Sequence, residues 1–306
     1  MKALKSVMGL VLGSCLLAPL SFSVMAAEGL MPFLAAPAQE GTTKDLGEQM
    51  KGKLKEAGFV VVGDFSSSGK ARILAVTSDA LKKAAAKGER SAYGAAMRVS
   101  LVEKDGKVSV SCTNPEYFAA AYHMGNNVAE VKKGLETAVG CNEAFGAGEM
   151  SAADIAGYHY AIGMEYLDDV YTLGEFGTFE DAKKAVEAGL ESNKAGVKKA
   201  YRIEIPGKNQ VVYGVLLNTK KSNKDADDGH IMGVLEQGDK NRFGYLPYEI
   251  LVNNNKVEAL HMRYRAAVHF PQLPMLGDGA SFFKLQASPD AIGEVLTEVV
   301  VPKAAQ

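Results

Sequence analysis

The chain has 306 residues and a formal net charge of −2, and 47% of its residues are hydrophobic while 23% are charged. This composition is typical of a globular protein, and the length suggests about two domains of roughly 100–200 residues each. Because the net charge is small and no basic tract occurs, nothing in the charge pattern predicts a nucleic-acid partner.

Residues 1–26 are predicted to be a cleavable signal peptide. Lys2 and Lys5 precede a long uncharged apolar run, and residues 24–26 are modest in size, as expected before a cleavage site at Ala27. The mature protein is therefore predicted to be exported, soluble and periplasmic.

Two alternatives concern the same segment. A retained transmembrane anchor is disfavoured by Pro19 and several small residues, since a spanning helix needs about 20 apolar residues. A lipoprotein anchored at Cys15 is the second alternative, because residues 12–15 resemble a lipobox; the apolar run that continues past Cys15 favours ordinary cleavage. No later segment is apolar for long enough to cross a bilayer.

Residues 27–41 contain Pro32 and Pro37 and lack periodicity, so we expect a flexible lead. A first α+β domain is expected over residues 42–140. Its elements, in order, are a helix capped by Thr42 or Thr43, strands over 59–65 and 72–77, a short helix after Ser78, a hairpin with arms over 95–103 and 107–113, and helices after Asn114 and over 128–139.

Two cysteines, Cys112 and Cys141, remain after loss of the signal peptide. Cys112 has the core-facing parity of its strand, and Cys141 follows a helix that must pack on the same sheet. An oxidising compartment favours a disulfide between them. The alternative, one buried free thiol and one thiol near the surface, stays open because the sequence does not fix their separation.

A partly helical connector is expected over residues 141–177, followed by a second α+β domain over 178–301. The second domain is expected to contain a helix after Thr178, strands over 197–206 and 211–218, a polar insertion over 220–228, a hairpin with arms over 247–252 and 256–270, and a helix over 288–299. The two halves repeat one order of elements. We therefore predict two tandem small domains, each an antiparallel-rich sheet packed against helices, and interpret them as an internal duplication; the alternative is two unrelated α+β domains.

The hairpin of the first half carries a family resemblance. Residues 58–60, 98–99, 105–108 and 114–115 resemble the bacterial domain of unknown function 302 family, over about residues 44–140 and more faintly over 178–300. The resemblance implies a small α+β domain with an antiparallel-rich sheet and no established activity. Many members carry a cysteine just before the first hairpin strand. Met97 and Tyr248 stand at the matching positions here, so any role of that cysteine is missing.

Signatures of catalysis and metal binding are weak. The sequence has no Gly-x-Ser-x-Gly, His-Glu-x-x-His or Cys-x-x-Cys, so no catalytic residue, cofactor or metal is predicted. An acidic stretch could offer oxygens to Ca²⁺, but a solvated loop is favoured because Gly229 is one place early for an EF-hand. Its residues are Asp225, Asp227, Asp228, His230 and Glu236.

The best polar constellation lies in the last predicted hairpin arm. His261, Arg263, Arg265 and His269 share strand parity and would project from one face. Such a cationic row is suited to an anion, since guanidinium groups match oxyanions. The alternative is a solvent-exposed face paired with neighbouring carboxylates.

Three functions follow as hypotheses. The first is a periplasmic binding or accessory protein whose partner is a small anionic ligand or another periplasmic protein. The second is an enzyme of unrecognised type with its site in a cleft between the domains, which perturbed pKa values there would favour. The third is a protein-interaction module, which a large exposed apolar patch would favour.

Overall fold

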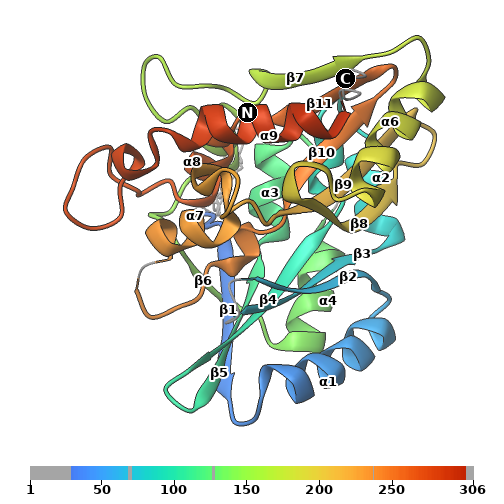
Figure 1. The fold of residues 1–306 in the computed structure, drawn as a ribbon. Coiled ribbons are helices and arrows are strands. Elements are labelled where there is room, and N and C mark those ends of the chain that lie inside the picture. The colour runs from blue at the N-terminus through green and yellow to red at the C-terminus, as the bar shows by residue number, and fades with distance from the viewer. Residues whose placement is uncertain (1–28, 68–70, 126–127, 237, 301–306) are drawn as a thin grey trace, which may run out of the picture.

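The computed structural model describes residues 29–67, 71–125, 128–236 and 238–300 (Figure 1). The predicted signal peptide, the lipobox at Cys15 and the cleavage site at Ala27 lie outside the described residues. Within them the fold is mixed α+β, built on two antiparallel sheets. No described helix combines the length and apolar character needed to cross a bilayer.

The first sheet has the strand order β2-β3-β4-β5-β1-β6. Its strands are β1 (Phe33–Gln39), β2 (Val60–Ser67), β3 (Ala71–Thr77), β4 (Met97–Lys104), β5 (Lys107–Thr113) and β6 (Glu143–Phe145). The predicted hairpin of the first half is β4 and β5, joined by Asp105 and Gly106, both of which have positive φ. Such φ values are those that a tight two-residue turn requires.

The predicted flexible lead over 27–41 is wrong, because β1 lies inside the first sheet between β5 and β6. Pro37 misled the prediction, since proline lacks the N–H that a strand donates. The structure accommodates it at an irregularity of the ladder, where the pairing shifts between Ala36 and Gln39. The first structural unit therefore begins before residue 42.

The second sheet has the strand order β7-β11-β10-β9-β8. Its strands are β7 (Val170–Glu175), β8 (Val197–Glu204), β9 (Gln210–Leu217), β10 (Tyr248–Asn253) and β11 (Lys256–Leu260). The connector predicted over 141–177 thus supplies a strand to each sheet, β6 and β7. The hairpin arm predicted over 256–270 is wrong beyond Leu260, because the chain turns there into the helix α8 (Met262–His269).

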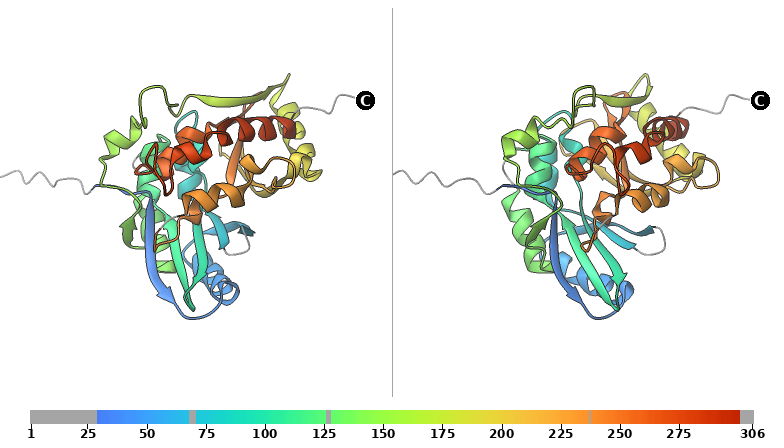
Figure 2. Two further views of the ribbon diagram at one scale, coloured as in Figure 1. Left: turned by 60° about the vertical axis from the view of Figure 1, so that its left-hand side comes forward. Right: turned by 90° about the vertical axis from the view of Figure 1, so that its left-hand side faces the viewer.

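The helices cover the outer faces of the two sheets. On the first sheet lie α1 (Thr43–Glu56) and α4 (Ala129–Val139), and on the second lie α6 (Phe179–Glu191) and α9 (Ser288–Val300). Figure 2, right, shows α4 on one side of the molecule and α9 on the other, with the strands between them. The remaining described α-helices are α2 (Asp79–Ala85), α3 (Pro115–Ala121), α5 (Ala152–Ala156) and α7 (Asp228–Leu235).

The two sheets have the same connectivity. Strands β2, β3, β4, β5 and β1 follow one another across the first sheet as β8, β9, β10, β11 and β7 do across the second. Even the ladder irregularities coincide, because β2 shifts register between Val61 and Gly63 and β8 shifts between Lys199 and Tyr201. Counting from these shifts, Arg98 of β4 and Glu249 of β10 occupy corresponding positions.

The helices that follow the hairpins contact each other reciprocally. Asn114 caps α3 and His261 caps α8. The Tyr117 hydroxyl, three residues after the first cap, donates to the carbonyl of Val268 at 2.8 Å. The Tyr264 hydroxyl, three residues after the second cap, donates to the carbonyl of Ala121 at 3.0 Å. Each acceptor lies seven residues after its cap, so the two contacts are reciprocal in position.

The cores of the two halves are continuous. Side chains of the second sheet and of α8 belong to the same buried cluster as the helices and strands of the first half; they include Tyr201, Ile203, Val212, Leu251, Leu260 and Tyr264. The edge strands β2 and β8 also meet, since a Cβ at Gly63 would lie 2.9 Å from the carbonyl oxygen of Ala200. The cleft that we expected between two domains is therefore largely filled.

Candidate functional site

The predicted cationic row does not form one face. Residues 262–269 are helical, so Arg265 and His269, four residues apart, lie on one side of α8, whereas Arg263, two residues from Arg265, points elsewhere. His261 caps the helix by accepting from the Arg263 amide at 3.4 Å, and Arg263 pairs with Glu165 at 3.1 Å. Arg265 and His269 are buried instead. No anion site can be built from the four together.

Arg265 lies inside the interface between the halves. Its guanidinium is 4.2 and 4.5 Å from the ring centroids of Tyr245 and Tyr248, and Nε donates to Glu249 Oε2 at 2.9 Å. Nη2 donates to the carbonyl oxygens of Tyr245 and Pro247. Nε and Nη2 of Arg265 are thus bonded to protein acceptors and are not available to an anionic ligand.

Arg98 binds the other oxygen of the same carboxylate. It forms a buried ion pair with Glu249 and also donates to the carbonyl of Ala96 at 2.9 Å and to the hydroxyl of Tyr201 at 3.2 Å. We call Arg98, Glu249 and Arg265 the interface charge cluster. Buried charges that are paired and hydrogen-bonded in this way hold two surfaces in register.

His269 is also structural in its surroundings. Its Nδ1 lies 2.8 Å from the Arg265 carbonyl oxygen, and its ring is 4.6 Å from the ring centroid of Phe118. Burial, with nearby Arg265, holds the pKa of His269 well below its usual range, so the imidazole is neutral at physiological pH. A neutral, buried histidine does not provide the cationic end of an anion-binding row.

Arg263, alone of the row, borders a small cavity of about 220 Å³. Met164, Met262 and Phe282 are among its walls, and Arg263 lies at its edge. The His261 ring packs on Tyr171, with centroids 4.4 Å apart, and burial lowers the pKa of His261. Arg263 and Glu165 neutralise each other here, so this cavity has little to offer a charged ligand.

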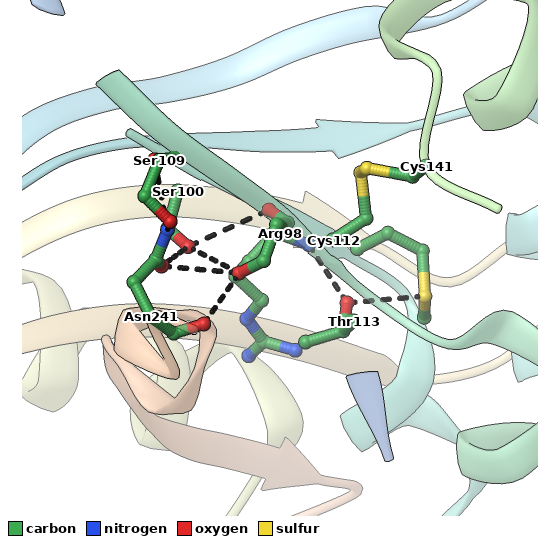
Figure 3. Close-up of a disulfide and its surroundings, with 9 residues drawn as sticks. Arg98, Ser100, Ser109, Cys112, Thr113, Cys141 and Asn241 are labelled. Carbon is green, nitrogen blue, oxygen red and sulfur yellow. Dashed lines mark hydrogen bonds between the residues drawn. A yellow bond between two sulfur atoms is a disulfide. The ribbon is translucent and has the colours of Figure 1, made fainter. Parts of the chain in front are cut away.

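The predicted disulfide is present, with 6.1 Å between the Cα atoms of Cys112 and Cys141. It ties β5 to the residue that follows the cap of α4. Figure 3 shows the bond on one side of β5 and the side chain of Asn241 on the other. The alternative of two free thiols does not describe this structure.

Asn241 connects the second half to the first sheet. Its side-chain oxygen accepts from the hydroxyls of Ser100 and Ser111, the latter at 3.0 Å. Its amide nitrogen donates to the carbonyl of Ser109 at 2.9 Å and to the hydroxyl of the same residue at 3.2 Å (Figure 3). Asn241 is 4% exposed, and its hydrogen bonds fix the segment after α7 against β4 and β5.

A cleft of about 440 Å³ opens beside Asn241. From the first half, its walls are Val102, Glu103, Lys104 and Ser109 of the β4–β5 hairpin. From the second half, they are residues of α7 and of the segment that follows, including Gly229, Met232, Gly233, Glu236, Asp239 and Phe243. We call this the hairpin cleft; its volume lies in the range of small-molecule sites.

Glycine keeps one wall of the hairpin cleft open. Gly233 lies inside α7, and a Cβ at that position would meet no heavy atom within 4 Å. Its backbone is helical without a positive φ, so no conformational demand explains the glycine. Glycine inside a helix costs roughly 0.5–1 kcal/mol relative to alanine. The space in front of Gly233 is thus kept at some cost in helix stability.

Glu236 supplies a carboxylate in the hairpin cleft. Both of its oxygens accept from the Arg242 amide, at 2.9 and 3.1 Å. Burial raises the pKa of Glu236 to about 7, against the opposing effects of the Arg242 amide and of the charges on Arg242 and Lys104. Its carboxyl group can therefore gain or lose a proton near neutral pH.

A larger hollow of about 740 Å³ lies beside α1 and is lined by Arg72, Glu48 and Glu103. Arg72 binds Asp64 at 2.6 Å and Glu48 at 2.5 Å, and Glu103 accepts from the Thr43 amide at 3.1 Å. Since Arg72 and Glu48 are already paired there, we favour the hairpin cleft as the site.

The acidic stretch is not a calcium loop. Asp227 caps α7 and accepts from the amides of Thr219, Lys220, Gly229 and His230, while Asp228 accepts from the amide of Leu217. Across the described residues, no three His, Cys, Asp or Glu side chains gather closely enough to hold a metal ion. The sequence suggested Glu236 only as a possible calcium ligand, whereas in the structure it lines the hairpin cleft. The sequence feature that could have indicated the cleft is the pair Gly229 and Gly233, one helical turn apart in α7.

Comparisons with protein-family models, with curated proteins and with solved structures find no match for this chain. The resemblance to the domain of unknown function 302 family stays a prediction.

Proposed function

We propose that this chain is an exported periplasmic binding protein, with its ligand site in the hairpin cleft and without catalytic activity. One observation carries the proposal: both halves build a cavity of about 440 Å³, and Gly233 presents no side chain to it. The interface charge cluster and Asn241 hold the halves against each other, so the walls are preorganised for a ligand. This replaces the anion site expected at residues 261–269.

Export is supported by the order of charged, apolar and small residues over 1–26. The disulfide between Cys112 and Cys141 is consistent with an oxidising compartment. N-terminal sequencing of the exported protein tests this part of the proposal. We expect Ala27 as the first residue; a lipid-modified Cys15 would identify a lipoprotein instead.

We also propose that the two halves are copies of one ancestral unit. Support comes from their equal strand order, the coincident register shifts in β2 and β8, and the reciprocal Tyr117 and Tyr264 contacts. In this view the hairpin cleft marks a place where the copies have diverged.

The second candidate function is an enzyme acting in the same cleft. The pKa of about 7 at Glu236 favours it, because a carboxyl group that titrates near neutrality can act as a general acid or base. Within the described residues, however, no nucleophile–base pair or metal cluster accompanies Glu236 in the cleft.

Native mass spectrometry of protein purified from its own periplasm tests the site. We expect a bound small molecule that is lost from the Gly233→Leu variant and retained by Gly52→Leu. Gly52 is a matched control, since it also lies inside a helix, α1, with no heavy atom within 4 Å of an added Cβ. Equal retention by both variants would contradict the site, and turnover of the released molecule by the wild-type protein would favour the enzyme.

A further inference from the structure

We infer that the hairpin cleft binds a small organic cation, an ammonium group that carries carbon substituents. The inference rests on the proposed function and adds the chemistry of the ligand. It is carried by the charges, the apolar walls and the free space of the cleft.

The carboxylates of the cleft outnumber its cations. Glu236 and Asp239 offer carboxylates to it, whereas the carboxylate of the lining residue Glu103 is held by the Thr43 amide; Lys104 is the cation among the described lining residues. Lys104 Nζ lies 3.5 Å from Asp239 Oδ1 and donates to the carbonyl of Gly238 at 3.3 Å. The charge of Lys104 is therefore largely offset by its own partners at the rim of the cleft. The remaining charge is negative, and it lies deepest at the half-buried Glu236. An anion would meet repulsion there, whereas a cation would be attracted.

The walls favour a cation with an organic body. Val102, Met232 and Phe243 contribute apolar surface around the carboxylate. An aromatic ring attracts a cation to its face, and alkyl groups on the cation can pack against valine and methionine. A bare metal ion would need several oxygen ligands at once, and the described residues offer no such group.

The protonation state of Glu236 makes the inference testable. The groups that face it are Lys104 of β4 and Arg242, which favour its ionised form, and burial opposes them. The Asp239 carboxylate also lines the cleft, while that of Glu103 accepts from the Thr43 amide. A cation should therefore bind more tightly as Glu236 loses its proton, between about pH 6 and pH 8.

Choline is a suitable probe because its charge does not titrate, and 3,3-dimethylbutan-1-ol is its neutral counterpart of the same shape. We would measure both by isothermal titration calorimetry with the full mature protein. At pH 8 we expect choline to bind about tenfold more tightly than the alcohol, because only choline is attracted by the ionised Glu236 carboxylate and by an aromatic ring such as that of Phe243. Choline affinity should fall about tenfold at pH 6, where a carboxyl of pKa near 7 is mostly protonated.

The variants separate this inference from the proposed function. Glu236→Gln should remove both the preference for choline and its pH dependence, while Glu191→Gln, at an exposed position in the last turn of α6, should change neither. Gly233→Leu should abolish binding of both probes. If the two probes bind equally and Gly233→Leu blocks both, the cleft is a binding site but the cation inference is overturned. If neither probe binds to the wild-type protein, the cation inference also falls, and the native mass spectrum still decides whether the cleft is a site.

Discussion

Glu249 is the residue on which the interface between the halves depends most. Its two oxygens bind two guanidinium groups, one from each half, and its side chain is 4% exposed. The cluster carries one negative and two positive charges, and the backbone carbonyls of Ala96, Tyr245 and Pro247 stabilise the excess positive charge. Loss of the carboxylate would leave two buried cations facing each other.

We therefore expect Glu249→Gln to lower the free energy of unfolding by about 3–5 kcal/mol, the usual cost of breaking a buried ion pair. Urea unfolding followed by circular dichroism measures this change. Glu204→Gln is the control, because its partner Arg202 lies at the surface and such exposed pairs contribute about 0–1 kcal/mol. A loss below 1 kcal/mol for Glu249→Gln would show that the charge cluster does not hold the halves together.

Asp228 gives the protein a pH-dependent stability. Burial raises its pKa to about 7, against an opposing hydrogen bond from the Leu217 amide. The pKa of Asp228 is higher in the folded protein than in the unfolded chain. Its contribution to the free energy of unfolding is therefore greatest below about pH 4 and is lost as the pH rises through 7.

Asp228→Asn keeps an acceptor for Leu217 and cannot ionise. Relative to the wild-type protein, we expect the variant to gain about 3 kcal/mol between pH 4 and pH 8, given about 1.4 kcal/mol per pKa unit. Urea unfolding at both pH values provides the measurement. A difference between the two proteins that stays constant with pH would show that Asp228 is ionised in the folded state throughout.

Single residues at helix ends were the features best predicted from the sequence. Thr42 (or Thr43), Ser78, Asn114 and Thr178 were expected at helix starts, and Thr42, Ser78, Asn114 and Thr178 each accept a backbone amide in the first turn of a helix. Capping depends on neighbours two or three residues away, so the sequence contains what is needed to predict it. The partners of Arg98, Glu249 and Arg265 could not be predicted in the same way, because they are distant in the sequence.

At the scale of elements, the prediction failed at the first strand of each half and after β11. β1 and β7 each precede the first helix of their half, and each is held by a distant hairpin strand, β5 or β11. Residues 262–269 alternate cationic and apolar side chains as a strand would, yet they form α8 and all but Arg263 are buried. A helix that is buried on nearly all sides lacks the amphipathic period by which helices are recognised.

The reciprocal tyrosines join the two helices that follow the hairpins. Each hydroxyl binds a carbonyl in the last turn of the other helix, where no further amide of that helix is available. Tyr117→Phe and Tyr264→Phe should each lower the free energy of unfolding by about 1 kcal/mol.

Thermal unfolding would compare both variants with Tyr166→Phe, whose ring is 50% exposed. The two interface variants should lose similar amounts, as expected of equivalent contacts. If one variant were silent while the other lost several kcal/mol, the contacts would not be energetically equivalent.

The disulfide restrains a loop with a sequence separation of 29 residues. Closing a loop of that length restricts the unfolded chain by roughly 3 kcal/mol in the entropy model, so reduction should destabilise the protein by about this amount. Thiol counting on the denatured, unreduced mature protein should find no free thiol. Two free thiols would mean that the cysteines are not bonded in the exported protein.

At the scale of the whole molecule, the sequence suggested two tandem domains with a cleft between them. The prediction captured the α+β class, because local periodicity and turn residues indicate the kinds of elements. It did not capture how the halves associate. In the sequence, Arg98, Ser100 and Glu249 have nothing to distinguish them from other strand residues. Their contacts with the opposite half are visible only in the structure.

This association predicts the unfolding behaviour of the molecule. Domains joined by a small polar interface unfold independently, whereas halves that share a core lose that core together. Here Tyr201, Leu251 and Tyr264 of the second half are buried in the cluster of the first, and Glu249 links both halves through its two arginines. We therefore expect one cooperative transition in urea for the disulfide-bonded protein. Tryptophan is absent from the chain, so single tryptophans introduced at Phe59, buried in the cluster of the first half, and at Phe179, partly buried against that of the second, can report on the two halves separately. The two probes should give the same midpoint, and midpoints that differ while each variant keeps the wild-type calorimetric enthalpy would show two independent domains.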